Sequence, residues 1–254
     1  MKVFLSSIEN TTRVDGKFLA EYIVENIGGL NYSLMSYYYI KNNVKHAEYI
    51  RDNSKEVLID SGAHSFQFGK KVNFEEYTKQ YAEFIKKFDT SNVVGYFEMD
   101  VDNIIGYDKV LELRKILESV SSKIIPVWHK NRGIEEYKKM CKDYAGKIIA
   151  ITGFLNTDIR DDDYLMFLKE AKKYNCKVHC LGMTRRKVLD KCPFDYVDSS
   201  TWVQQSIFGN IQNQGKVTKE FSKTSRHKIY LENYKEFTKL QKYYYQKWKK
   251  ECKD

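Results

Sequence analysis

The stretch that decides the fold is 56–67, which reads EVLIDSGAHSFQ. Its apolar run, 57–59, ends on Asp60 and is followed by small and polar residues. A short continuous apolar run of this kind is typical of a strand buried on both faces of a parallel sheet. The carboxyl ends of such strands are where α/β barrels carry their active sites. The stretch therefore predicts a parallel α/β protein with an acidic group at the carboxyl edge of its sheet.

The rest of the chain repeats this strand-and-helix unit about eight times. The strands are expected at 2–7, 31–40, 56–62, 92–100, 123–129, 147–154, 177–183 and 194–202. Their number and the chain length fit a (β/α)8 TIM-type barrel, and a doubly wound open sheet is the alternative. Two features weaken the barrel: Pro126 removes a hydrogen-bond donor from a central strand, and the helix at 185–192 is short.

The alternation stops after Trp202. We therefore expect a catalytic barrel over residues 1–202 and a second segment, 203–254, with a polar loop and a C-terminal helix packed on the barrel. That helix is basic and rich in aromatic residues. Its aromatic stripe is expected to pack on the barrel, and its lysines are free to meet phosphate; alternatively, both faces meet a nucleic acid strand.

Composition narrows the class of protein. The 254 residues carry a net charge of +9, which favours a polyanionic partner, although lysines on solvated helix faces give the same balance. No apolar run approaches the roughly 18 residues of a membrane span. The amino-terminal residues turn polar too soon for a signal peptide. A cytoplasmic protein with no membrane partner is expected.

The five cysteines indicate no metal site. No CxxC pair exists, so neither a disulfide framework nor a zinc ribbon is predicted. The stretch CKVHC, if it is a strand, places Cys176 and Cys180 on one face and His179 on the other. Buried free thiols are the simpler interpretation. We expect no metal and no cofactor.

Polar or glycine residues also end the later strands. They are Asp100, Asp102, His129, Thr152, Gly153, Gly182 and Asp198. In a barrel these ends converge on one mouth. An aspartate at a strand–helix junction can instead cap the next helix, which is the competing interpretation for Asp102. It fits Asp60 less well, because Ser61 and Gly62 do not begin a helical pattern.

Taken together, these stretches resemble the tRNA-guanine transglycosylases, also called queuine tRNA-ribosyltransferases. The stretch IDSGAHSFQ, 59–67, resembles their DSGGFQ motif. EMD, ending at Asp100, resembles the carboxylate that reads the purine. FDYVDSS, around Asp198, resembles their Asp-x-x-Asp-Cys end, whose second aspartate is the nucleophile. ITGF and LGM, 151–154 and 181–183, resemble their glycine pair and their Met-Gly-Val-Gly stretch.

The likeness preserves the order of the motifs and covers the chain to about Trp202. It is also close to short phage and genomic-island barrel proteins that modify guanine in DNA with 7-deazaguanines; for a phage-encoded protein the compartment would be the host cytoplasm. Two departures matter. No cysteine-and-histidine zinc site follows Asp198, and the pair His64–Ser65 interrupts the DSGGFQ pattern.

The resemblance implies a role for each candidate. Asp198 is expected to be the nucleophile that forms a covalent glycosyl-enzyme, and Asp60 the acid–base group. Asp195, which lies earlier in the same strand, is expected to be structural. The base-binding residues are expected to be Ser61, Gly62, His64, Phe66, Asp100, His129, Thr152, Gly153, Gly182 and Met183. Among them, His64 or Phe66 would stack on the base together with Met183.

Arg185 and Arg186 are expected to bind nucleic acid phosphate, unless they form only a solvated helix start. His129 binds phosphate or a ring edge, or is a histidine satisfied within the core.

The expected function is exchange of guanine in nucleic acid for a 7-deazaguanine base, with DNA favoured and tRNA possible. The free 7-deazaguanine base is the second substrate. Two alternatives stay open: an N-glycosylase or nucleoside hydrolase that releases a base, and a non-catalytic nucleic-acid-binding barrel. The oligomeric state is left open.

Overall fold

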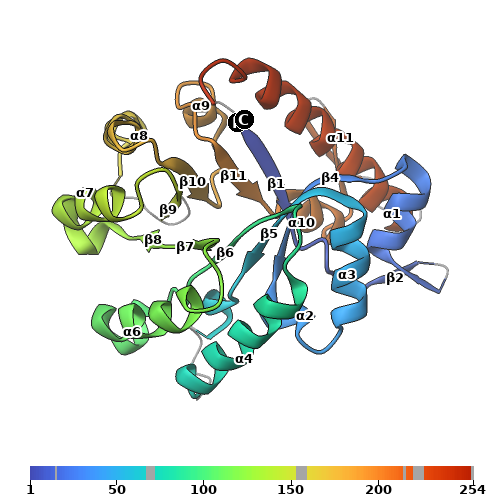
Figure 1. Cartoon of the computed structure of the whole chain (residues 1–254). Helices are drawn as coiled ribbons and strands as arrows, with labels where there is room; N and C mark the ends of the chain where they lie inside the picture. Colours follow the sequence, from blue (N-terminus) through green and yellow to red (C-terminus); the bar gives the residue numbers. More distant parts are fainter. Residues whose placement is uncertain (15, 67–71, 153–158, 214–215, 220–225, 253–254) are drawn as a thin grey trace.

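The fold is a nearly closed barrel of parallel strands surrounded by helices (Figure 1). It is taken from a computed structural model that describes residues 1–14, 16–66, 72–152, 159–213, 216–219 and 226–252. The barrel strands, in order, are β1 (Lys2–Ser6), β4 (Leu30–Ser36), β5 (Ser54–Asp60), β6 (Val93–Phe97), β7 (Ile124–Ile125), β8 (Val127–Trp128), β9 (Ile148–Thr152), β10 (Lys177–Leu181) and β11 (Tyr196–Ser199). The two ends of this strand order, β7 and β8, are separated in the chain by Pro126 alone, so the ring of strands nearly closes there and the predicted barrel is confirmed over the open sheet.

The helices follow one another around the strands in chain order (Figure 1). The outer helices are α1 (Leu19–Ile27), α3 (Val44–Asp52), α4 (Phe74–Phe88), α6 (Tyr107–Glu118), α7 (Gly133–Asp143), α8 (Tyr164–Lys173), α9 (Arg186–Leu189) and α11 (Arg226–Lys247). The C-terminal helix α11 lies between α9 and α1 and contacts β1. It therefore takes the eighth place in the outer layer, although the sequence places it beyond residue 202.

Pro126 lies at the seam where the barrel closes. It separates β7, which pairs with β6, from β8, which pairs with β9. A proline has no backbone N–H to donate, but its carbonyl oxygen accepts the N–H of Ala150 at 2.8 Å. The chain therefore pairs with β6 before Pro126 and with β9 after it. The missing N–H of the proline falls at this change of partner strand, so it interrupts neither pairing.

Three apolar clusters fill the molecule. The barrel interior contains Phe4, Leu34, Leu58, Phe97, Ile125, Val127, Ala150 and Tyr196. Two further clusters lie between strands and helices, one under α1 to α6 and the other under α7 to α9. Helix α11 contributes to both, through Tyr234 in the first and Tyr244 in the second. Its aromatic residues thus pack on the barrel.

The segment after Trp202 differs from the predicted polar loop. It begins with helix α10 (Thr201–Ile207) and continues into a hairpin of β12 (Asn210–Asn213) and β13 (Lys216–Lys219). The helix buries Trp202, Val203 and Ser206, too few apolar residues for a recognisable helical pattern. A second small hairpin, β2 (Arg13–Val14) with β3 (Lys17–Phe18), precedes α1. Among the described helices, none is long and apolar enough to cross a membrane.

Candidate active site at the barrel mouth

Asp198 lies near the carboxyl end of β11 and points into the barrel. It is two residues beyond Tyr196, an interior side chain, and alternate residues of a strand share a face. Its carboxylate accepts hydrogen bonds from Ser6 Oγ at 3.0 Å, His179 Nε2 at 3.0 Å and Gly182 N at 2.8 Å. The donors come from β1, from β10 and from the turn after β10. Three donors hold the carboxylate in one orientation.

One residue that the sequence analysis left outside the site is His179. Its ring is fully buried in the barrel interior, 5.0 Å from the ring of Phe97. Because Nε2 faces a carboxylate, it carries the proton, and Nδ1 has no hydrogen-bond partner among the described residues. The signal was the strand alternation in CKVHC, which places His179 on the face opposite the cysteines. The histidine is therefore a partner of Asp198.

Asp60 ends β5, and strands β4 and β1 lie between β5 and β11 in the barrel. Its Oδ2 accepts the N–H of Gly62 at 2.8 Å and the hydroxyl of Ser36 at 3.3 Å. Burial raises the pKa of Asp60 to about 6, the charges of Asp100 and Asp198 add to the rise, and the two hydrogen bonds oppose it. A carboxyl group that titrates this close to neutral pH can both donate and accept a proton.

A buried carboxyl group, that of Glu9, lies next to Asp60. The backbone N–H of Ser36 donates to Glu9 Oε1 at 3.1 Å, so Ser36 contacts both acids. Glu9 is 6% exposed, and its Oε2 has no hydrogen-bond partner among the described residues. Burial, with a further contribution from the charge of Asp60, raises the pKa of Glu9 to about 7. The sequence analysis missed Glu9 because it follows its strand by three residues rather than ending it.

Asp100 belongs to a network of ion pairs just beyond β6. His129 Nε2 lies 2.5 Å from Asp100 Oδ1, and Arg132 lies 3.7 Å from that oxygen. The Nε of Arg132 donates to Asp102 Oδ2 at 3.0 Å, and its guanidinium lies over the ring of Tyr107 at 4.1 Å. Burial lowers the pKa of His129, but its pairing with Asp100 outweighs this, so the pKa is raised.

The same network includes three side chains that could in principle hold a metal ion. Ligand atoms of Asp100, Asp102 and His129 lie within 4.8 Å of one another. However, Arg132 already contacts both aspartates, so a guanidinium supplies the positive charge there. Sequence analysis did not select Arg132. It lies three residues beyond His129, in the short turn η2 (Lys130–Arg132).

The stacking expectation is wrong for two residues. Phe66 is buried against Tyr38 and Tyr77, and Met183 is buried in the cluster under α7 to α9. Apolar packing against the helices outcompetes exposure at the mouth, so neither side chain is available to cover a base. The side chain of His64 lies outside the described residues.

Gly62 has a structural reason to be glycine. Its φ of +84° is a conformation that residues with a Cβ rarely adopt, and a Cβ there would lie 2.4 Å from Tyr38 Cβ. Tyr38 is therefore the neighbour that requires a glycine here. Ser61 is also fully buried, and its carbonyl oxygen accepts the hydroxyl of Tyr77 at 2.8 Å.

The remaining candidates lie at the β9 and β10 ends. Thr152, the last residue of β9, shares the interior face with Ala150, and Gly182 donates to Asp198. Gly153 lies outside the described residues. Arg185 is exposed and pairs with Asp161 at 3.2 Å, and Arg186 is exposed at the start of α9.

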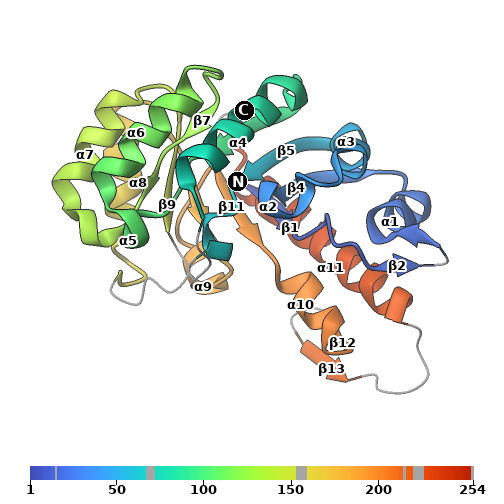
Figure 2. The same cartoon turned by 90° about the horizontal axis from the view of Figure 1, so that it is seen from below.

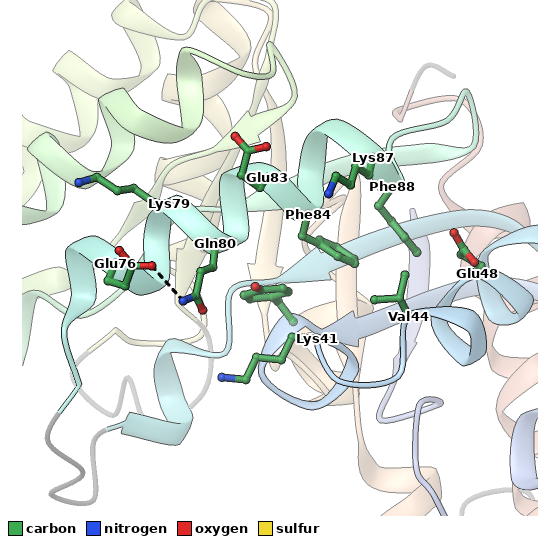
Figure 3. Close-up of a pocket in the computed structure, with 11 residues that line it drawn as sticks. Lys41, Val44, Glu48, Glu76, Lys79, Gln80, Glu83, Phe84, Lys87 and Phe88 are labelled. Carbon is green, nitrogen blue, oxygen red and sulfur yellow. Dashed lines mark hydrogen bonds between the residues drawn. The ribbon is translucent and has the colours of Figure 1, made fainter.

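A groove on the outside of the barrel is a separate feature. It has a volume of about 380 Å³ and lies between α4 and the neighbouring helices α2 (Tyr37–Ile40) and α3. Figure 3 shows Phe84 and Phe88 of α4 facing Val44 across it, with lysines and glutamates around the rim. None of the acids at the mouth lines it. The acids at the mouth, and not the lining of this groove, therefore mark the candidate active site.

Comparisons with known proteins bear on the fold alone. No family model matches the chain, and no curated protein matches it. One similar solved structure is a mutant tryptophan synthase alpha-subunit from Pyrococcus furiosus, with 14% identity, 93% of this chain and 96% of that chain covered, and a TM-score of 0.50. Another, from Aquifex aeolicus, has 11% identity, covers 92% of each chain and has a TM-score of 0.48.

Proposed function

We propose that this protein is an enzyme that exchanges a guanine base in nucleic acid for a 7-deazaguanine base. The observation that carries the proposal is the presence, at one barrel mouth, of two aspartates that are held by different sets of hydrogen-bond donors. Asp198 is held by three hydrogen-bond donors, as an oriented nucleophile requires. Asp60 is half-buried and has a pKa of about 6, as an acid–base group requires. The motif resemblance assigns the nucleophile role to Asp198.

The chemistry has two halves. A carboxylate oxygen of Asp198 attacks the anomeric carbon, the bond from that carbon to the base nitrogen breaks, and the electron pair leaves with the base. Asp60 gives its proton to the departing guanine. The incoming base then gives a proton to Asp60, attacks the anomeric carbon and releases the Asp198 carboxylate. Protons and electron pairs balance, and no oxidant or reductant is needed.

Asp100 supports recognition of guanine. Its carboxylate is an acceptor suited to the N1 and N2 donors of the base, and His129 and Arg132 orient it. DNA is favoured over tRNA because no zinc site follows Asp198. In duplex DNA the target base must leave the stack, so single-stranded or distorted DNA should react faster.

The test is to incubate the protein with single-stranded DNA or tRNA and a candidate 7-deazaguanine base, and then to analyse the nucleosides by mass spectrometry. Incorporation of the added base supports exchange, whereas base release alone indicates an N-glycosylase. Binding without either product indicates a non-catalytic barrel. Labelling of tRNA with none of DNA would overturn the DNA preference.

Variants separate the two roles. Asp198→Asn should keep binding but form no denaturation-resistant adduct, because an amide is a poor nucleophile. Asp60→Asn should still form the adduct but slow exchange by roughly 10²- to 10⁴-fold. Asp195→Asn is the matched control, because Asp195 lies at the opposite end of the barrel, where it accepts the N–H of Val178 at 2.8 Å. An adduct that depends on Asp195 and not on Asp198 would contradict the assignment.

A further inference from the structure

Two neighbouring apolar side chains are exposed at the end of helix α10. Ile207 is 50% exposed and Phe208 is 70% exposed. Single exposed apolar residues are common on protein surfaces. Here two adjacent ones begin the turn between α10 and the hairpin β12–β13, which Figure 2 shows projecting from the barrel. We call residues 207 and 208 the α10 tip.

The side chain of Asn233 fixes the backbone around this tip. Asn233 of α11 is fully buried, and its amide group donates to Ser206 Oγ and to the carbonyl oxygen of Asn210, both at 2.8 Å. Its Oδ1 accepts the backbone N–H of Gln212 at 2.9 Å. One buried amide therefore holds the chain on both sides of the tip. The fold presents Phe208 to solvent in a defined place.

Helix α10 is linked through hydrogen bonds to the proposed nucleophile, Asp198. Trp202 is fully buried and donates its indole N–H to the carbonyl oxygen of Ser6 at 2.9 Å. The hydroxyl of Ser6 donates to Asp198. At about 1.5 Å per residue, the seven residues of α10 place the tip on the order of 10 Å beyond this anchor. Stacked nucleotides rise about 3.4 Å each, so the spacing corresponds to roughly three nucleotides.

Charge favours a nucleic acid strand over a second copy of this chain. The net charge of +9 attracts a polyanion and makes two copies repel each other. Helix α11, which contains Asn233, also exposes Arg226 and Lys228 in its first turn. Exposed aromatic rings combined with cationic side chains are the features by which proteins hold single strands.

We propose that the α10 tip is a stacking platform, on which Phe208 holds a base a few nucleotides from the reacting guanine. This inference rests on the proposed function for the identity of the strand. It goes further by naming a contact outside the mouth that would grip the substrate while the target base is out of the stack.

The test compares Phe208→Ala and Phe208→Trp with Tyr243→Ala. Tyr243, 54% exposed near the far end of α11, is the matched control for loss of an exposed aromatic ring. Binding of a fluorescein-labelled 12-nucleotide single-stranded DNA containing one guanine is measured at a fixed, low salt concentration. Phe208→Ala should weaken binding by roughly 5- to 150-fold, the range for loss of one stacked base. Phe208→Trp should bind as tightly as wild type, and so should Tyr243→Ala.

Each outcome decides the proposal. Unchanged binding by Phe208→Ala would overturn it, and so would equal weakening by Tyr243→Ala. A wild-type dimer that becomes monomeric in Phe208→Ala would show that the tip binds a second copy, which also overturns it. Phe208-dependent binding without base exchange would uphold the platform and reject the proposed function. Base exchange, with DNA binding that does not depend on Phe208, would support the proposed function and reject the platform.

Discussion

At the scale of single residues, the acids at the mouth differ in the number of hydrogen-bond donors that contact each carboxyl group. Asp198 has three donors, whereas Asp60 has two, and Glu9 has one backbone donor and one oxygen without a partner among the described residues. Burial costs a charged group more when fewer donors compensate it. Asp60, which has two donors, accordingly has a pKa of about 6, whereas Glu9, which has fewer, has a pKa of about 7.

The buried histidine gives a prediction at this scale. His179→Leu removes a donor to Asp198, and a hydrogen bond to a charged group contributes about 1.5–3 kcal/mol. We expect base exchange to slow by roughly 10- to 150-fold in kcat, with KM little changed, because His179 positions the nucleophile and does not meet the base. Steady-state kinetics on an oligonucleotide measure both constants.

His179→Gln is the control, because its side-chain amide can donate from about the position of Nε2. It should recover part of the lost rate. Equal loss in both variants would mean that the imidazole acts only by filling the barrel interior.

At the scale of elements, the barrel seam depends on a buried ion pair. Glu98, directly after β6, is fully buried and receives two hydrogen bonds from Arg114 of α6, at 2.6 and 3.0 Å. It also accepts the N–H of Val127 at 2.6 Å, just after Pro126. Burial raises the pKa of Glu98 in spite of the guanidinium. The side chain thus joins β6, β8 and α6 where the strand ladder is interrupted.

This arrangement predicts a large loss of stability for Glu98→Leu. The variant leaves a buried guanidinium and a buried N–H without their partner, and breaking a buried pair in this way costs about 3–5 kcal/mol. The free energy of unfolding in urea measures the loss. Glu112→Gln, which breaks the exposed pair with Lys109 on the same helix, should change it by about 1 kcal/mol or less. A comparable effect of the two substitutions would show that the seam does not depend on Glu98.

At the scale of the whole molecule, the barrel concentrates acids at one end. Asp60, Asp100 and Asp198 come from three strands, and Glu9 follows a fourth. Parallel strands in a closed ring direct all their carboxyl ends to the same side. Among them, Glu9 and Asp60 make folding depend on pH, because the raised pKa of each means that its carboxyl group binds a proton more tightly in the folded chain than in the unfolded chain.

Glu9 provides the test of this dependence. Its pKa rises from 4.5 to about 7 on folding, so its stabilising contribution is complete below pH 4.5 and is lost as the pH rises to about 7. The loss is about 3 kcal/mol for a single group. Glu9→Gln should therefore flatten the decline in the free energy of unfolding between pH 4.5 and 7, and should be more stable than wild type at pH 8.

Urea unfolding at several pH values measures this decline. The exposed Glu83→Gln is the control and should leave its slope unchanged. A wild-type slope in Glu9→Gln would mean that Glu9 does not hold its proton in the folded state.

The sequence by itself determined the strand-and-helix order and the positions of the strand-end acids. Continuous apolar runs such as 57–59 indicated buried parallel strands, and parallel strands bring Asp60, Asp100 and Asp198 to one mouth. Tertiary structure alone decided which side chains meet there. Phe66 and Met183 packed against helices, whereas His179 and Glu9 turned to the acids, because side-chain direction depends on neighbours from distant segments. Hydrogen bonding and burial act through space, and nearness along the chain does not reveal them.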